Sequence, residues 1–254
     1  MLLVVDVGNT QTHFGTYRGE ELVEHWRFAT ERSSTADEIG AALRNLLELR
    51  QVSFDDLRAS IVSSTVPQLE PEWVSMAERY LGHRMLAVGP GLKTGMPIRI
   101  DNPRELGADR LVNAVAAHDL LGGPCISVDF GTAVNYDVVS PEGDYLGGVI
   151  APGVEISLDA LTSRGAKLPR IDLQAPRAAI GKGTVDAIRS GIIFGFAAQV
   201  DGLVARIRAE LGADAPTIAT GGLAQHIVPY TETIDRIDDF LTLRGLKLLH
   251  ERNA

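Results

Sequence analysis

The sequence predicts an α/β protein built from two similar halves. A short apolar strand ending in Asp-x-Gly occurs twice, at residues 3–8 near the start and at 127–131 near the middle. Strands alternate with helical segments after each copy, which is typical of layered α/β domains. With 254 residues, 45% of them hydrophobic, the chain can bury a substantial core as one large domain or as two similar ones. The repeated segment favours two halves that arose by duplication.

The first half predicts a sheet with helices added to it. A helix should begin at Thr35, because this threonine can cap it, acidic residues follow in the first turn, and Ile39, Leu43, Leu46 and Leu47 recur at helical spacing. We expect Trp73, on a second helix, to pack in the core. The elements expected in this half are strands at 3–7, 13–17, 21–28 and 59–64, the helix after Thr35 and a helix at 70–81.

The second half repeats this order of elements. An apolar strand at 124–128 leads into Asp129, and a returning strand follows at 136–139 before a turn at 141–144. A long helix is expected at about 185–211, followed by a strand at 217–220.

The two Asp-x-Gly turns have the features of phosphate-binding turns. Each follows a β-branched strand and contains a glycine, so backbone N–H groups and the hydroxyls of Thr10 and Thr132 could face a phosphate. Asp6 and Asp129 would repel a bare phosphate, and their presence makes sense if a cation or ordered water lies between. Either turn alone would be better explained as a hairpin turn. Two copies, one in each half, favour a phosphate site.

A third glycine element follows the strand at 217–220. Gly221 and Gly222 would let the backbone approach a flat or charged ligand, which suits the sugar and base of an adenine nucleotide. Alone, it would be only a tight strand-to-helix connection. Together with the two turns it predicts a nucleotide site.

Two familiar nucleotide motifs are excluded. The segment at 181–184, Gly-Lys-Gly-Thr, lacks the hydroxyl residue directly after lysine that a Walker A loop needs, and Pro176 occupies the place of the upstream glycine. No strand leads into G-x-G-x-x-G with a following acidic residue.

The reactive groups are expected at 107–110, Gly-Ala-Asp-Arg, near the start of a helix. Asp109 could accept a proton from a substrate hydroxyl, and the Arg110 guanidinium could pair with a substrate carboxylate. An Asp-Arg pair at a helix start is equally often a cap in contact with solvent. From chemistry alone the two interpretations are balanced.

Composition restricts the class of protein. A net charge of −9 argues against a surface built to bind nucleic acid. Cys125 is the only cysteine, which excludes an intrachain disulfide and a cysteine metal cluster, and it is expected to be buried. The six histidines show no metal-ligand spacing. We find no signal segment and no apolar stretch of membrane-spanning length, so we expect a cytoplasmic protein.

Five short segments resemble, in the same order, the motifs of type III pantothenate kinases. They are residues 6–10, 107–110, 129–133, 147–153 and 219–223. The likeness extends to 163–169 and 240–246, so it spans essentially the whole chain. It implies the fold of the superfamily of acetate and sugar kinases, heat-shock chaperones and actin: two ribonuclease H-like domains, here at 1–113 and 114–254, with a nucleotide cleft between them.

The resemblance also implies a reaction, ATP-dependent phosphorylation of the primary hydroxyl of pantothenate, the first step of coenzyme A biosynthesis. Asp109 corresponds to the catalytic base and Asp129 to the ligand of a monovalent cation, potassium or ammonium, with Mg²⁺ accompanying ATP. A homodimer is implied, in which Thr184 contacts substrate across the interface. The ATP-binding residues would be Asp6, Val7, Gly8, Asn9, Thr10, Gln11, Thr12, His13, Thr132, Gly221 and Gly222, and the substrate-binding residues Gly107, Ala108, Asp109, Arg110 and Thr184.

The chain departs from the family pattern at a few positions. Ile100 replaces a tyrosine of the substrate pocket, Val134 and Asn135 replace two threonines, and Gln11 and His13 occupy a variable part of the first turn. Two alternatives follow: another small-molecule kinase of the superfamily, or a non-catalytic accessory protein in transcription.

Overall fold

The computed structural model describes residues 1–164 and 171–254, and the chain forms two compact units. The first unit comprises residues 1–95, 102–116 and 242–254, and the second comprises 96–101 and 117–241. These boundaries differ from the expected division at residue 113. The closing helix belongs with the first unit because Gly245 packs against the backbone of Val112, where a Cβ would overlap the carbonyl oxygen. The assignment of ribonuclease H-like domains at 1–113 and 114–254 stays a prediction.

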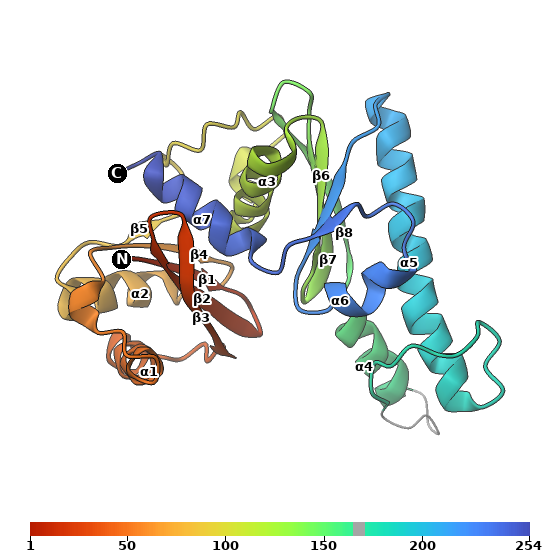
Figure 1. The fold of residues 1–254 in the computed structure, drawn as a ribbon, viewed down its shortest axis with the longest axis horizontal. Helices are drawn as coiled ribbons and strands as arrows, with labels where there is room; N and C mark the ends of the chain where they lie inside the picture. The colour runs from red at the N-terminus through yellow and green to blue at the C-terminus, as the bar shows by residue number, and fades with distance from the viewer. Residues whose placement is uncertain (165–170) are drawn as a thin grey trace. The chain divides into compact units, whose positions relative to one another are not determined.

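The first unit is a mixed five-stranded sheet with helices (Figure 1). Its central strand β1 pairs antiparallel with β2 and parallel with β4. The strand order is β3-β2-β1-β4-β5. The elements are β1 (Leu2–Val7), β2 (Gln11–Arg18), β3 (Glu21–Ala29), α1 (Ala36–Glu48), η1 (Phe54–Asp56), β4 (Ala59–Ser64), α2 (Glu70–Met76), η2 (Ala77–Leu81), β5 (Leu86–Ala87), η3 (Pro103–Glu105), the first part of α3 (Ala108–Leu121) and α7 (Leu241–Glu251).

The second unit holds another mixed five-stranded sheet with helices. Here the central strand β6 pairs antiparallel with β7 and parallel with β9, and the order read from the other edge is β8-β7-β6-β9-β10. The elements are β6 (Cys125–Phe130), β7 (Ala133–Val139), β8 (Tyr145–Pro152), α4 (Val154–Arg164), α5 (Thr184–Leu211), β9 (Thr217–Thr220), α6 (Ala224–Ile227), η4 (Val228–Tyr230) and β10 (Arg236–Ile237).

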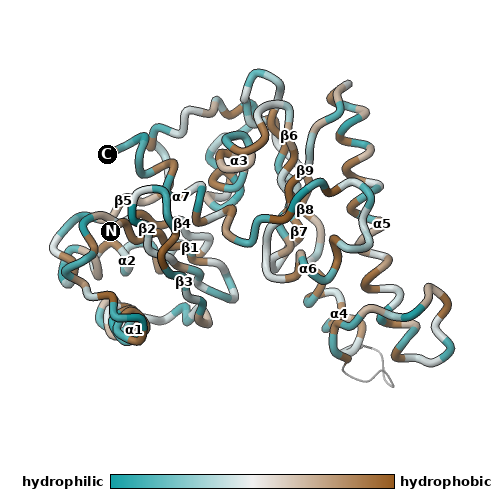
Figure 2. Tube along the Cα trace, viewed as in Figure 1, coloured by the Kyte–Doolittle hydropathy of each residue, from teal (hydrophilic) through white to brown (hydrophobic). Residues whose placement is uncertain are grey.

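The two sheets have the same topology, which confirms the predicted doubling. In each, the first strand is central, the second and third continue antiparallel on one side, and the fourth and fifth continue parallel on the other. The two Asp-x-Gly turns follow the equivalent central strands β1 and β6. Figure 2 shows hydrophobic segments along the strands of each unit. The predicted α/β fold is therefore correct.

Local sequence explains the helices of the first unit. Thr35 and Glu38 form the predicted capping box at α1, and Ile39, Leu43 and Leu47 are buried against the sheet. The helix expected at 70–81 is present, but its last turn, 77–81, is π-helical. Trp73 is 1% exposed, as predicted.

Helix α5 corrects the expectation that no segment is long enough to span a membrane. Its 28 residues are long and apolar enough to cross a membrane, with a mean hydropathy of 1.3 over the most apolar window. Its apolar residues nevertheless serve the core of the second unit, where Ile192, Val200 and Val204 are buried. Core helices pass the same test, and 39% of this window is buried inside the protein.

Candidate active site

The first Asp-x-Gly turn spans residues 8–11 between β1 and β2. Val7 pairs with Thr12, and the Gly8 N–H donates to the Gln11 carbonyl at 3.0 Å. A Cβ on Gly8 would lie 2.9 Å from that carbonyl oxygen, so glycine is required for this close turn. Asn9, Thr10 and Gln11 are exposed. The turn therefore presents small polar residues at the carboxyl end of β1, the end at which α/β sheets bind ligands.

Neighbouring segments hold this turn in place. The Thr30 N–H donates to the Thr10 carbonyl at 2.9 Å, and the hydroxyls of Thr12 and Thr30 lie 2.9 Å apart. Thr65, directly after β4, donates its N–H to the Val7 carbonyl at 2.9 Å. The carboxyl ends of the parallel strands β1 and β4 are thus joined beside the turn.

Five of the eight residues in the predicted ATP-binding run are strand residues, because β1 ends with Asp6 and Val7 and β2 begins with Gln11, Thr12 and His13. Thr12 is 1% exposed and paired with Thr30, so its hydroxyl faces the interior. His13 pairs with Asp6 in the ladder, and its ring meets that of His25 edge to face at 5.7 Å. Burial, with the nearby Arg27 and His25, lowers the pKa of His13 to about 3. Its side chain is neutral at physiological pH and supplies no positive charge to a phosphate.

The second turn, residues 131–133, is tighter than the first. Phe130 pairs with Val134, and the Gly131 N–H donates to the Ala133 carbonyl at 3.0 Å. The backbone of Gly153 passes so close to this turn that a Cβ on Gly153 would overlap the Thr132 carbonyl oxygen. The segment 147–153 therefore supports this turn. No role was predicted for Gly153 from the sequence, although it lies in the glycine-rich segment 147–153 that carries part of the family resemblance.

The third glycine element lies directly against Asp129. Gly221 has φ +95°, and a Cβ there would lie 2.5 Å from Asp129 Oδ1 and 2.6 Å from the Phe130 nitrogen. Thr220 and Asp129 are paired in the parallel ladder of β6 and β9. The structure thus brings together Asp129 and Gly221, which the sequence predicted from separate motifs.

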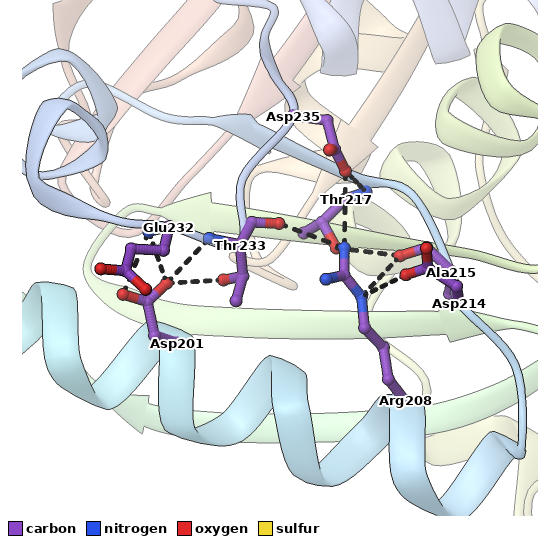
Figure 3. Close-up of polar contacts among 8 residues, drawn as sticks. All are labelled: Asp201, Arg208, Asp214, Ala215, Thr217, Glu232, Thr233 and Asp235. Atoms are coloured by element: carbon purple, nitrogen blue, oxygen red, sulfur yellow. Dashed lines mark hydrogen bonds and ion pairs between the residues drawn. The ribbon is translucent and has the colours of Figure 1, made fainter.

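Two side chains of α5 fix the strand that carries Gly221 (Figure 3). The Arg208 guanidinium donates to the Ala215 carbonyl at 3.0 Å and to the Thr217 hydroxyl at 3.3 Å. The Asp201 carboxylate accepts from the Thr233 hydroxyl at 2.7 Å, and from backbone N–H groups of the same loop. These contacts hold β9 and the loop before β10 against the helix. Sequence analysis missed them because the partners lie up to 32 residues apart.

The Asp129 carboxylate lies between Gly221 and the turn that begins at Gly131, where built Cβ atoms would lie 2.5 and 3.6 Å from Oδ1. A carboxylate oxygen is a ligand that hard cations take, and the cation at Asp129 stays a prediction. Within 1–164 and 171–254, no cluster of three or more His, Cys, Asp or Glu side chains could hold a metal.

Asp109 lies in the first turn of α3, at the predicted helix start. Its carboxylate folds back over Gly107, where a Cβ would lie 2.6 Å from Oδ1. Burial raises its pKa above the ordinary value of 3.8, whereas the backbone N–H and the charge of Arg110 oppose this shift. A carboxylate with a raised pKa is a stronger base. Backbone N–H groups of Asp109 and Arg110 hydrogen-bond to this carboxylate at the start of the helix, and its role as a base stays a prediction.

Helix α7 supports the part of α3 that carries Asp109. The Thr242 hydroxyl donates to Asn113 Oδ1 at 2.8 Å, and Gly245 permits close approach to Val112. Lys247, 4% exposed, pairs with Glu20 at 2.8 Å. Asp109 thus lies at the start of a helix that packs against the C-terminal helix and is buried from Leu111 to Ala117.

The structure also places three other residues that the sequence singled out. Thr184 is the first residue of α5 and is exposed. Ile100 contacts Gly147, with its Cγ2 3.5 Å from a Cβ built on that glycine. Cys125 is buried, and burial raises its pKa to about 12, in keeping with a structural role. Residues 165–169 of the segment at 163–169 lie outside the described residues.

Comparison with known proteins identifies the family. The family model for type III pantothenate kinase matches residues 2–206. The chain belongs to the type III pantothenate kinase family. Curated members include proteins from Moorella thermoacetica, 50% identical over the full length of both chains, and from Streptomyces griseus, 50% identical over 100% of this chain and 99% of that one.

Solved structures agree on the fold. A protein described as a Baf family transcriptional activator from Campylobacter jejuni has a TM-score of 0.62 at 18% identity, covering 99% of this chain and 98% of that one. Component A of (R)-2-hydroxyglutaryl-CoA dehydratase from Acidaminococcus fermentans has a TM-score of 0.58 at 16% identity, covering 100% and 96%. At these identities the likeness concerns fold alone. The likeness supports the predicted α/β fold.

Proposed function

We propose that this pantothenate kinase uses Asp109 as the general base that removes the proton from the primary hydroxyl of pantothenate. Membership of the family carries the reaction: an ATP-using kinase phosphorylates pantothenate in coenzyme A biosynthesis. The position of Asp109 supports the role, since a partly buried carboxylate with a raised pKa can accept a hydroxyl proton. Gly107, Ala108 and Arg110 would bind the acceptor beside it.

The nucleotide would be held mainly by main-chain and small polar groups. The turn at 8–11 offers exposed polar residues at the end of β1, and Thr132 and Gly222 offer exposed positions in the second unit. Phosphoryl transfer requires chiefly in-line positioning and neutralisation of charge. Of the eight residues predicted at 6–13, the buried Val7 and Thr12 and the strand residue His13 would act through the strands rather than by contacting phosphate.

A monovalent cation, potassium or ammonium, would bind at Asp129, with Mg²⁺ accompanying ATP. Such a cation would supply positive charge beside the Asp129 carboxylate, which would otherwise repel phosphate. The position of the Asp129 carboxylate directly before the turn at 131–133 and against Gly221 supports this assignment.

A homodimer is proposed, with α5 in its interface. The exposed residues of this helix include the small residues Gly191, Gly195, Ala198 and Gly202. Each of these three glycines has open space where a Cβ would be. Small residues allow close helix approach, and the nearby Ile180 and Ile156 are exposed at 85% and 47%. A second copy would cover this surface, and Thr184 at its edge would then reach the partner's substrate.

A coupled ADP-release assay tests the enzyme. We expect pantothenate-dependent turnover by the wild type, stimulated by potassium or ammonium over sodium, and loss of that stimulation in Asp129→Asn. Absence of pantothenate-dependent ADP release in every monovalent salt would contradict the proposed function.

A further inference from the structure

Arg32, between β3 and α1, directs its side chain to the first phosphate turn. Its Nη2 donates to Asn9 Oδ1 at 3.1 Å, across 23 residues of sequence. Both side chains are exposed, so the contact lies at the surface of the turn. None of the site residues predicted from the sequence places a positively charged side chain at this turn.

The carboxylates near Arg32 have other partners. Glu31 accepts from the hydroxyl of Ser33 at 2.9 Å, Glu38 from the N–H of Thr35 at 2.8 Å, and Glu72 from the N–H of Ala36 at 2.7 Å. No ion pair of Arg32 is found in the part of the chain that the structure describes. The guanidinium is always charged and has five N–H donors, of which Asn9 occupies one.

The loop that carries Arg32 is fixed to the turn at its base. Thr30 contacts the turn through its N–H, bonded to the Thr10 carbonyl, and through its hydroxyl, bonded to Thr12. A tight turn closed by the Ser34 N–H and the Glu31 carbonyl follows, with Arg32 inside it. Arg32 is therefore positioned by main-chain geometry as well as by Asn9.

Asn9 is suited to hold the guanidinium without neutralising it. Its Oδ1 faces Arg32, while its Nδ2 lies 3.5 Å from the Thr65 hydroxyl, which itself donates to the Val7 carbonyl at 3.2 Å. An amide keeps the positive charge available, whereas a carboxylate here would cancel it. A guanidinium with free donors beside backbone N–H groups matches phosphate oxygens, which arginine binds in bidentate fashion.

We propose that Arg32 binds the terminal phosphates of the nucleotide at the turn 8–11, with Asn9 as its positioning residue. This inference rests on the proposed function, because it assigns the phosphates of that nucleotide to Arg32. Its charge offsets the repulsion between the phosphates and Asp6.

Calorimetric titration with ATP, ADP and AMP, without pantothenate, tests the proposal. We expect Arg32→Ala to weaken ATP binding about tenfold or more, as loss of a charged hydrogen bond predicts, and AMP binding less than twofold. Arg32→Lys should fall between. Arg58→Ala is the matched control, because Arg58 is an exposed arginine just before β4, at the opposite end of the parallel strands.

A double-mutant cycle separates binding from folding. In an Asn9→Ala background the further loss caused by Arg32→Ala should shrink, because the two residues act together. The Tm without nucleotide should stay near that of the wild type, and Arg32→Lys serves if the alanine variant unfolds. ATP binding by Arg32→Ala within twofold of the wild type, or an equal loss for AMP, overturns the proposal.

The outcomes distinguish this inference from the proposed function. A wild type that binds ATP through Arg32 but shows no pantothenate-dependent ADP release refutes the kinase assignment alone. Turnover by the wild type with unchanged ATP affinity in Arg32→Ala refutes the role of Arg32 alone. A wild type that binds no ATP refutes both.

Discussion

At the scale of single residues, the carboxyl group of Asp109 is subject to two opposing influences. Burial raises its pKa, and the N–H and charge of Arg110 counteract that rise. Because burial is the larger influence, the folded state binds the proton more tightly than the unfolded chain does. The charged form therefore costs stability at neutral pH, as is common for residues placed for catalysis.

Asp109→Asn should separate the base from the cap. Asparagine can still cap α3 but cannot accept a proton, so we expect kcat to fall at least about 100-fold. The Tm should be equal to or above that of the wild type, because the buried charge is removed. In the wild type, kcat/KM should decline on acidification with a midpoint above 3.8, the ordinary carboxyl value. A variant that keeps its activity would identify Asp109 as a cap only.

His13 predicts a pH dependence of stability. Its pKa in the folded state is about 3, against the ordinary histidine value of 6.5. Below pH 6.5 the unfolded chain gains a proton that the folded protein does not, so stability is lost as the pH falls. Between pH 7 and 5 we expect the unfolding free energy to drop about 2 kcal/mol more in the wild type than in His13→Gln. Urea unfolding measures this, with the exposed His226→Gln as control.

At the scale of elements, the glycines at strand ends determine how closely the turns approach their neighbours. Gly221 requires both a positive φ and open space beside Asp129. Gly212, at the end of α5, has φ +64° with nothing within 4 Å of a Cβ. Comparing substitutions at these two glycines separates the cost of backbone strain from the cost of crowding against Asp129.

Gly221→Ala should therefore cost more than Gly212→Ala. The latter bears only the strain of a positive φ, about 1–2 kcal/mol, whereas the former also displaces Asp129 or Phe130. We expect a larger fall in unfolding free energy and weaker nucleotide binding for Gly221→Ala. Equal losses in the two variants would show that the contact with Asp129 is unimportant.

At the scale of the whole molecule, α5 links the core of the second unit to the proposed dimer. One side carries Ile192, Val200 and Val204 into the core, and the other carries small exposed residues. The exposed side has open space at Gly191, Gly195 and Gly202, where a second copy would pack.

Gly195→Glu should dissociate the dimer. A carboxylate at this position would be desolvated against an apolar surface, which disfavours association. Sedimentation should show a dimer for the wild type and for Ala41→Glu, an equivalent change at an exposed position of α1, but a monomer for Gly195→Glu. A monomeric wild type would contradict the proposal.

The sequence by itself determined the α/β class, the doubled strand-turn unit, the capped start of α1 and the extent of α5. These features depend on hydrophobic period, glycine and capping residues within a few positions of one another, so they are local. Its motifs also indicated the family and the residues at 107–110.

Only the tertiary structure decided which distant residues meet. Gly221 lies against Asp129, Gly153 beneath Thr132, α7 against α3, and Arg32 on Asn9. It also turned Thr12 and His13 into the sheet, because the strand β2 begins at Gln11. Such contacts depend on sheet order and on packing between segments far apart in the chain, which no local pattern of residues encodes.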